Sequence, residues 1–177
     1  MTGFFHLDGF LDCCDAILSR RDLPTRQKIL KDSRVGAFAV VCAILLFLFS
    51  FAAMADADLG EGWRALLLIP VITRCMAGVA VETFAPMQTS QYAGTFAAGK
   101  TKKQRRILLC MYLAVMALDF LWLFSRPACA LAVAWAGLTT ILSCRAARRN
   151  LGGMSGDIAG FSITLGELSG LLILAIF

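Results

Sequence analysis

Charged side chains are scarce in this chain of 177 residues. They make up 16% of the sequence, against roughly 25% in an average soluble domain, whereas 59% of the residues are hydrophobic. The mean hydropathy of +0.74 agrees with this imbalance. The composition excludes an ordinary soluble globular domain, and the length predicts one membrane-embedded domain over residues 1–177.

Three further absences narrow the function. The seven cysteines include no Cys-x-x-Cys pair, so a zinc or disulfide framework is disfavoured and the thiols are interpreted as small packing residues. The amino terminus has no basic stretch followed by a long apolar run, so no secretory signal is indicated. The basic run from Lys100 to Arg106 has no aromatic platform, so nucleic acid is not an expected partner.

Apolar stretches dominate the rest of the sequence. A helix needs about 20 mostly apolar residues to cross a hydrocarbon core about 30 Å thick. Five stretches fit this description: 35–55, 65–81, 107–125, 127–144 and 158–177. The predicted fold is therefore all-α: a polytopic membrane bundle of about five transmembrane helices over 35–177, preceded by an Asp-rich head with an acidic helix at 1–34.

The basic residues are unevenly distributed between the segments that join these stretches. Six lie in 1–34, five in 82–106 and three in 145–157, whereas the alternate loops hold only Arg64 and Arg126. Short loops rich in Lys and Arg stay in the cytoplasm. The head and the loops 82–106 and 145–157 are therefore predicted to be cytoplasmic.

Three aspartates near the amino terminus have helical spacing. Asp8, Asp12 and Asp15 fall at about 0°, 40° and −20° around one helix, which places them on a single narrow stripe. Like charges on one stripe destabilise an isolated helix. A divalent cation would neutralise them, and carboxylate oxygens suit Mg²⁺ or Mn²⁺. The alternative is a solvated acidic face.

A second polar cluster precedes the first apolar stretch. Arg34 could bind a phosphate as a bidentate fork, and Asp32 could add a metal ligand. The alternative is an interfacial anchor followed by a helix start.

A glycine-rich segment precedes the last apolar stretch. Gly152, Gly153 and Gly156 would let backbone N–H groups approach an anion at a helix start. The spacing of four from Gly152 through Gly156 to Gly160 also indicates close helix packing in lipid. Close packing would bring Asp157 beside the first acidic helix.

Three ionisable residues interrupt the apolar stretches. Arg74, Asp119 and Glu167 should be paired or functional, because an ionised group at the membrane centre costs about 2.5–3.5 kcal/mol on insertion scales. Glu167 is expected to pair with Arg74, and Asp119 is a rival partner. A transporter would use these three residues as an ion path.

These segments, in this order, resemble the cobalamin synthase family of adenosylcobinamide-GDP ribazoletransferases. The residues that carry the resemblance are Phe5 to Gly9 with Asp12 and Asp15, Asp32 to Arg34 with Gly36, Arg74, Leu151 to Gly153, Gly156 with Asp157, and Gly166 with Glu167. The resemblance implies a Mg²⁺-dependent transfer in a bacterial inner membrane, with its site on the cytoplasmic face. α-Ribazole, or its 5′-phosphate, would be joined to adenosylcobinamide-GDP, giving adenosylcobalamin or its phosphate and GMP.

Residue roles follow from the same resemblance. Metal ligands would be Asp8, Asp12, Asp157 and Asp32. Asp15 or His6 would deprotonate the attacking hydroxyl, Arg34 would hold the leaving nucleotide, and Gly152, Gly153 and Gly156 would bind substrate. A homo-oligomer is left open.

Two departures from the family and two rival functions accompany this resemblance. Family chains begin with a further apolar segment, so a fragment or a natural short form is expected here, and the loop 83–92 lacks the family's Glu-Gly-Leu-Gly-like pattern. A phosphotransferase of the CDP-alcohol type would share the metal site but use a lipid acceptor. An inactive assembly subunit is another alternative.

Overall fold

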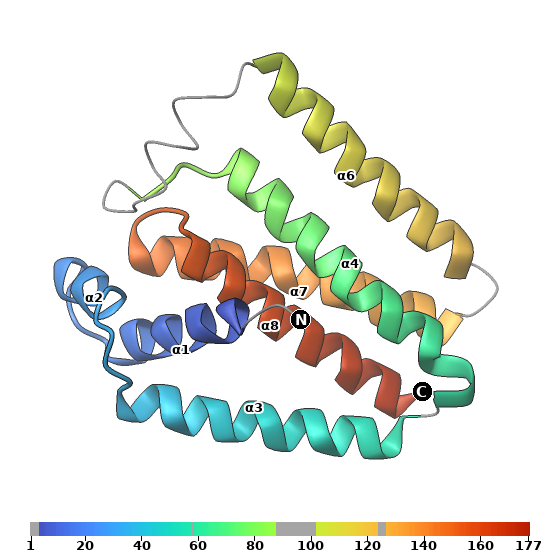
Figure 1. Ribbon diagram of the computed structural model, residues 1–177, viewed down its shortest axis with the longest axis horizontal. Coiled ribbons are helices and arrows are strands. Elements are labelled where there is room, and N and C mark those ends of the chain that lie inside the picture. Colours follow the sequence, from blue (N-terminus) through green and yellow to red (C-terminus); the bar gives the residue numbers. More distant parts are fainter. Residues whose placement is uncertain (1–3, 58, 88–101, 124–126) are drawn as a thin grey trace.

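The computed structural model describes residues 4–57, 59–87, 102–123 and 127–177, and these ranges consist mainly of helices (Figure 1). The helices are α1 (Phe5–Leu18), α2 (Leu23–Ile29), α3 (Ala37–Asp56), α4 (Leu59–Thr83), α6 (Lys102–Leu123), α7 (Pro127–Leu151) and α8 (Gly156–Ile176). The prediction of an all-α fold is confirmed.

Four helices in these ranges are long and apolar enough to cross a membrane. They are α3, α4 from Gly62 onward, α7 and α8, and they coincide with four of the five predicted spans. The remaining predicted span falls on α6, where many side chains lie outside the described residues. The fifth span therefore stays a prediction.

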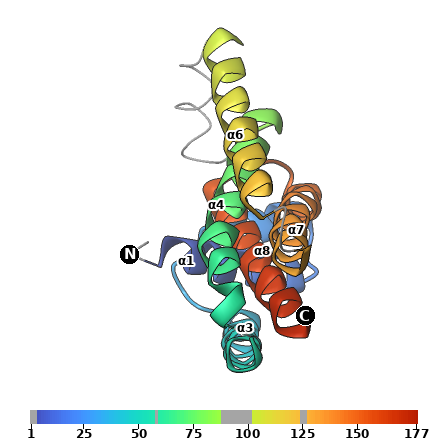
Figure 2. The same ribbon diagram turned by 90° about the vertical axis from the view of Figure 1, so that its right-hand side faces the viewer.

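Helix α8 is the centre of the bundle. It packs against α7, α1, α4 and α3, while α3 and α6 lie at opposite edges (Figures 1 and 2). Glycines allow the close approach: a Cβ on Gly160 would lie 3.1 Å from the Cα of His6, and one on Gly170 would lie 2.9 Å from the Cβ of Ala136. The predicted packing of small residues is confirmed for α8.

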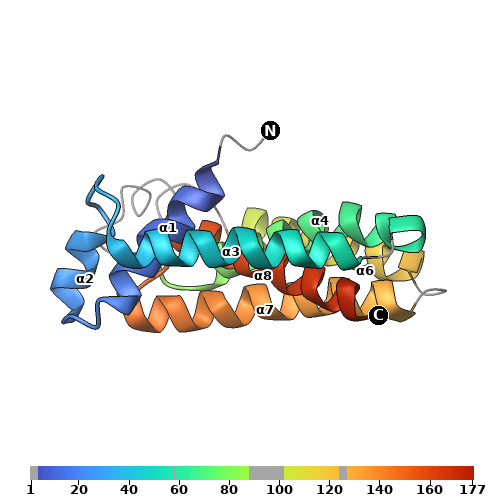
Figure 3. The same ribbon diagram turned by 90° about the horizontal axis from the view of Figure 1, so that it is seen from below.

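Helix α3 has a largely exposed apolar surface. Phe47, Leu48 and Phe51 are among its exposed side chains, and few of its residues are buried within the protein. It runs along the outside of the bundle, as the view from below shows (Figure 3). Such a helix fits a lipid-facing position, because lipid rather than protein then covers its apolar side chains.

The amino-terminal residues do not stand apart from the bundle. Helix α1 packs against α8 and α3, and α2 lies beside the end of α7. Arg26 donates from Nη1 to the carbonyl of Asn150 at 2.9 Å, and Gln27 donates from Nε2 to that of Leu151 at 2.8 Å. The segment after α4 also meets the α7–α8 connection, since Met87 N–H donates to the carbonyl of Met154 at 2.8 Å. One end of the bundle thus gathers the segments predicted to be cytoplasmic.

Candidate active site

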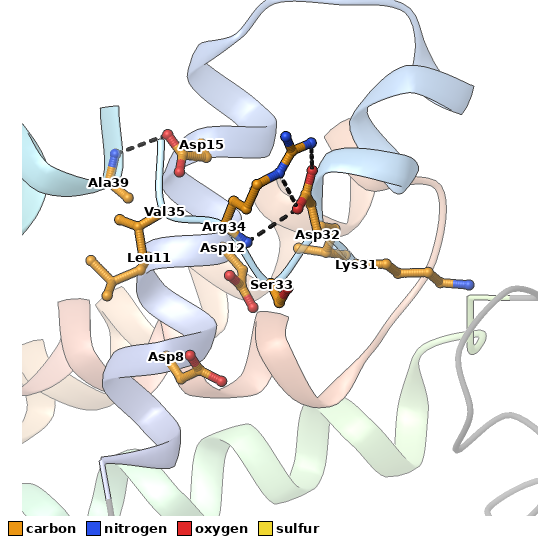
Figure 4. A pocket seen from close by; sticks show the side chains of 11 residues that line it. Asp8, Leu11, Asp12, Asp15, Lys31, Asp32, Ser33, Arg34, Val35 and Ala39 are labelled. Atoms are coloured by element: carbon orange, nitrogen blue, oxygen red, sulfur yellow. Dashed lines mark hydrogen bonds and ion pairs between the residues drawn. The ribbon is translucent and has the colours of Figure 1, made fainter. Parts of the chain in front are cut away.

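A cavity of about 250 Å³ lies between α1 and the segment that joins α2 to α3. Asp8 and Asp12 line it from α1, and Ser33 faces them from the connecting segment (Figure 4). The other lining residues are Leu11, Asp15, Leu30, Lys31, Asp32, Arg34, Val35 and Ala39. The acidic stripe and the second polar cluster therefore line one cavity.

Asp12 is the most perturbed carboxyl group on the α1 side of this cavity. Burial, followed by the negative charges of Asp8, Asp157 and Asp15, raises the pKa of Asp12 to about 7. The charges that act on it are all of its own sign. A divalent cation would relieve this repulsion and hold Asp12 ionised.

Asp157 lies close to the aspartates of α1 because α8 packs closely against α1. A Cβ on Gly9 would lie 2.7 Å from the carbonyl oxygen of Asp157, so only glycine permits this approach. Ser155 caps α8 by accepting the Ile158 N–H at 3.3 Å. The predicted position of Asp157 beside the acidic helix is confirmed.

The carboxylates at this site suit a Mg²⁺ ion that is bound partly by water and substrate, rather than a metal ion enclosed by protein ligands alone. Among the described residues, no three His, Cys, Asp or Glu side chains converge as a ready metal cluster. Mg²⁺ usually keeps several waters and binds through one or two carboxylates together with substrate phosphates. Asp8, Asp12 and Asp157 could serve it in this way, and their roles as ligands stay predictions.

Asp15 points away from the other two aspartates of the stripe. Its Oδ2 accepts the Gly36 N–H at 2.6 Å. Its Oδ1 accepts the Ala39 N–H at 3.0 Å (Figure 4). The helical spacing of the stripe is confirmed, but the third carboxylate turns toward the start of α3. Both oxygens accept backbone donors, and the predicted role of Asp15 as a base stays a prediction.

Asp32 and Arg34 bind each other. The guanidinium donates from Nε to Oδ1 at 3.0 Å and from Nη2 to Oδ2 at 2.8 Å, and these bonds lower the pKa of Asp32 to about 2. The Arg34 side chain is 87% exposed, so it remains accessible to an anion. The predicted roles of Arg34 in nucleotide binding and of Asp32 as a metal ligand stay predictions.

His6 lies near the amino end of α1, outside the residues that line the cavity. Its carbonyl accepts the Thr164 hydroxyl at 3.3 Å, which holds this part of α1 against α8. Its predicted role as a base also stays a prediction.

The expected intramembrane ion pair is present. Arg74 on α4 donates from Nη1 to Oε1 of Glu167 on α8 at 2.5 Å and to the carbonyl of Pro70 at 2.9 Å. The predicted pairing of Arg74 with Glu167 is therefore confirmed. The side chain of Asp119, the rival partner, lies outside the described residues.

The glycine-rich segment has a structural reason for each of its first two glycines. Gly152 has φ +83°, in the left-handed region, and a Cβ on Gly153 would overlap the backbone of Met87. Met154 N–H donates to the Ala85 carbonyl at 2.9 Å. Gly156 begins α8. Substrate binding by these glycines stays a prediction, and residues 88–92 of the divergent loop lie outside the described residues.

Two serines at this end of the bundle were not among the predicted site residues. Ser155 was not recognised as the cap of α8, although a serine directly before a helix start is a usual capping signal. Ser33 lies within the Asp32 to Arg34 stretch that carries the family resemblance but was given no role, and its place in the cavity depends on how the α2–α3 segment crosses α1.

Comparison with known proteins identifies the family of this chain. The family model described as cobalamin-5-phosphate synthase matches residues 1–175. The chain belongs to this family. Among cobalamin-5-phosphate synthase relatives, an adenosylcobinamide-GDP ribazoletransferase of Clostridium perfringens strain 13 is 38% identical over 99% of this chain and 70% of its own length.

Two other members of the family show similar agreement. An enzyme of the same name from Clostridium botulinum strain Alaska E43 is 34% identical over 100% of this chain and 70% of its own length. One from Halalkalibacterium halodurans is 37% identical over 94% of this chain and 65% of its own length. No solved structure matches this cobalamin-5-phosphate synthase family member.

Proposed function

We propose that this chain is an adenosylcobinamide-GDP ribazoletransferase, which joins α-ribazole or its 5′-phosphate to adenosylcobinamide-GDP in the final step of adenosylcobalamin (vitamin B12) biosynthesis. The observation that carries the proposal is the family match over residues 1–175, on a chain whose Asp8 and Asp12 line a cavity at one end of a membrane-type bundle.

The reaction breaks the phosphoanhydride bond of the diphosphate and forms a phosphodiester. A ribazole hydroxyl oxygen forms a bond to the phosphorus that carries cobinamide, and the bond from that phosphorus to the oxygen of the departing GMP breaks. The hydroxyl proton passes to a base, and GMP carries away the electron pair of the broken bond. Such a transfer depends on positioning and on neutralising charge.

The roles of the residues follow from their positions. Asp8, Asp12 and Asp157 would hold Mg²⁺, or Mn²⁺, which when bound neutralises diphosphate charge. Arg34 extends from the opposite wall with an exposed guanidinium, which suits the phosphate of the leaving nucleotide. The short helix approach at Gly9 keeps the acidic side chains of α1 and α8 together.

We place the cavity on the cytoplasmic face of a bacterial inner membrane. Fourteen of the 17 Lys and Arg residues lie in the three segments that the sequence predicts to be cytoplasmic. The cavity lies among these same segments, at the end where α2 meets α7. Both water-soluble substrates would reach it there.

The test is a direct assay on purified protein in detergent. Incubation with Mg²⁺, adenosylcobinamide-GDP and α-ribazole should release GMP and form adenosylcobalamin, separated by chromatography. Asp12→Asn should abolish release. Asp22→Asn is the matched control, because Asp22 is exposed and its Oδ1 accepts only the Thr25 hydroxyl at 2.7 Å, a bond that an asparagine Oδ1 also accepts.

The same assay distinguishes the rival functions. A phosphoryl product that extracts with lipid would indicate a CDP-alcohol type of acceptor. Uptake of substrate by vesicles with no GMP release would indicate a transporter. Either result, or full activity of Asp12→Asn, would contradict the proposal.

A further inference from the structure

The segment 31–36, here called the strap, separates two cavities. One is the acidic cavity of about 250 Å³, and the other, of about 530 Å³, lies on the other side of the strap toward Arg21 and Phe38. Four residues line both cavities: Asp15, Asp32, Arg34 and Val35. The position of the strap therefore sets the shape of both cavities at once.

One buried side chain ties the strap to α1. Asp15 is 9% exposed and accepts the N–H groups of Gly36 and Ala39 at 2.6 and 3.0 Å. Gly36 is where the strap enters α3, and a Cβ there would lie 2.6 Å from Oδ1 of Asp15. The glycine and the aspartate are thus fitted to each other.

The start of α3 needs this carboxylate. The first N–H groups of a helix have no partner within the helix, and Gly36 has no side chain with which to cap them. A negative charge at this end is also favoured by the helix dipole. Asp15 supplies both from 21 residues earlier in the chain.

We propose that Asp15 is a positioning residue that anchors the strap to α1 through the start of α3, and not a metal ligand. Through this anchor it holds Asp32 and Arg34 over the acidic helix. The effect on turnover rests on the proposed transferase function, whereas the effect on stability does not.

The first test compares stability without metal. In EDTA, Asp12→Asn removes one of several mutually repelling charges, so its melting temperature should equal or exceed that of the wild type. Asp15→Asn loses an acceptor and places an amide against backbone donors, so it should melt about 5 °C lower. Little repulsion is relieved in exchange, because the Asp15 carboxylate turns toward the start of α3 and away from Asp8 and Asp12.

The outcomes separate the two roles. A lower melting temperature for Asp15→Asn, or its failure to fold while Asp12→Asn folds, supports the anchor. A melting temperature raised as in Asp12→Asn would overturn it. Asp22→Asn serves again as the control and should melt as the wild type does.

The second test is a double-mutant cycle with Gly36→Ala and Asp15→Ala. In the wild type the new methyl group would collide with the carboxylate, so Gly36→Ala alone should lower the melting temperature strongly. In the Asp15→Ala background the collision is absent and the further loss should be small. Losses that simply add would show that the two positions are independent and would overturn the proposal.

The third test uses turnover. Asp15→Asn should lower kcat, on the order of a hundredfold for a displaced strap, while the Mg²⁺ concentration that gives half-maximal activity stays within about twofold of the wild type. A Mg²⁺ requirement raised well beyond that range would make Asp15 a ligand and overturn the proposal. If the wild type itself has no transferase activity, the proposed function fails, and the first two tests still decide the role of Asp15.

Discussion

The raised pKa of Asp12 predicts that the metal-free protein loses stability as the pH rises. Burial and the nearby carboxylates raise this pKa from the ordinary 3.8 to about 7 in the folded protein. Between these two values the folded state holds a proton that the unfolded state has released. The free energy of unfolding therefore falls as the pH rises from about 4 to about 7, and the stabilising contribution is complete only below about 4.

The magnitude follows from the size of the shift. Each pKa unit corresponds to about 1.4 kcal/mol, so a shift of about three units would give about 4 kcal/mol for a fully buried group. Asp12 is only half-buried, and screening by solvent reduces this to about 2 kcal/mol. For a chain of this size that is a fall in melting temperature of about 6 °C.

The assay is thermal unfolding of the purified protein in detergent with EDTA, at pH values from 4 to 8. Asp12→Asn should show a flatter dependence on pH and should be more stable than the wild type at pH 8. Added Mg²⁺ should restore the stability of the wild type at pH 8 but not change that of the variant. An identical pH dependence in the two proteins would refute the assignment of this pKa to Asp12.

Three further predictions concern the bundle. Glu167→Gln should reduce the free energy of unfolding by on the order of 3 kcal/mol, because Arg74 then loses its partner between α4 and α8; adding Arg74→Met should recover part of the loss, measured by thermal unfolding. Gly9→Ala should lower GMP release strongly, since its methyl group would push α1 from α8; normal release would show that this approach is unnecessary. A cysteine at Thr101 should react with an impermeant maleimide only from the cytoplasm, and one at Gly60 only from outside, with the unaltered chain as background; reversed labelling would place the cavity on the other face.

Asp12 and Asp15 show which features of the site the spacing of the acidic residues could predict and which it could not. Their shared stripe on α1 follows from helical periodicity and was predicted correctly. The direction of each carboxylate depends on which helix lies opposite it, and that partner is set by the crossing of α1 with α3 and α8. One aspartate therefore lines a cavity, and the other caps a helix.

The intramembrane residues give a second comparison. The cost of an unpaired charge in an apolar span was enough to predict that Arg74 has a partner. Two acidic candidates lay in other spans, and the choice of Glu167 depended on the face that α8 presents to α4. The rise of a helix gives the depth of Glu167 in the membrane, but it does not tell which way α8 is rotated about its axis.

The sequence by itself determined the properties that arise from neighbouring residues: the apolar helices, the acidic stripe and the glycine spacing of α8. The tertiary structure alone decided that the strap crosses α1, that Asp15 turns to α3, and that Gly153 packs on the segment after α4. The physical reason is that periodicity and charge act within a few residues along the chain. The rotation and crossing of helices depend instead on packing between residues that are distant in sequence.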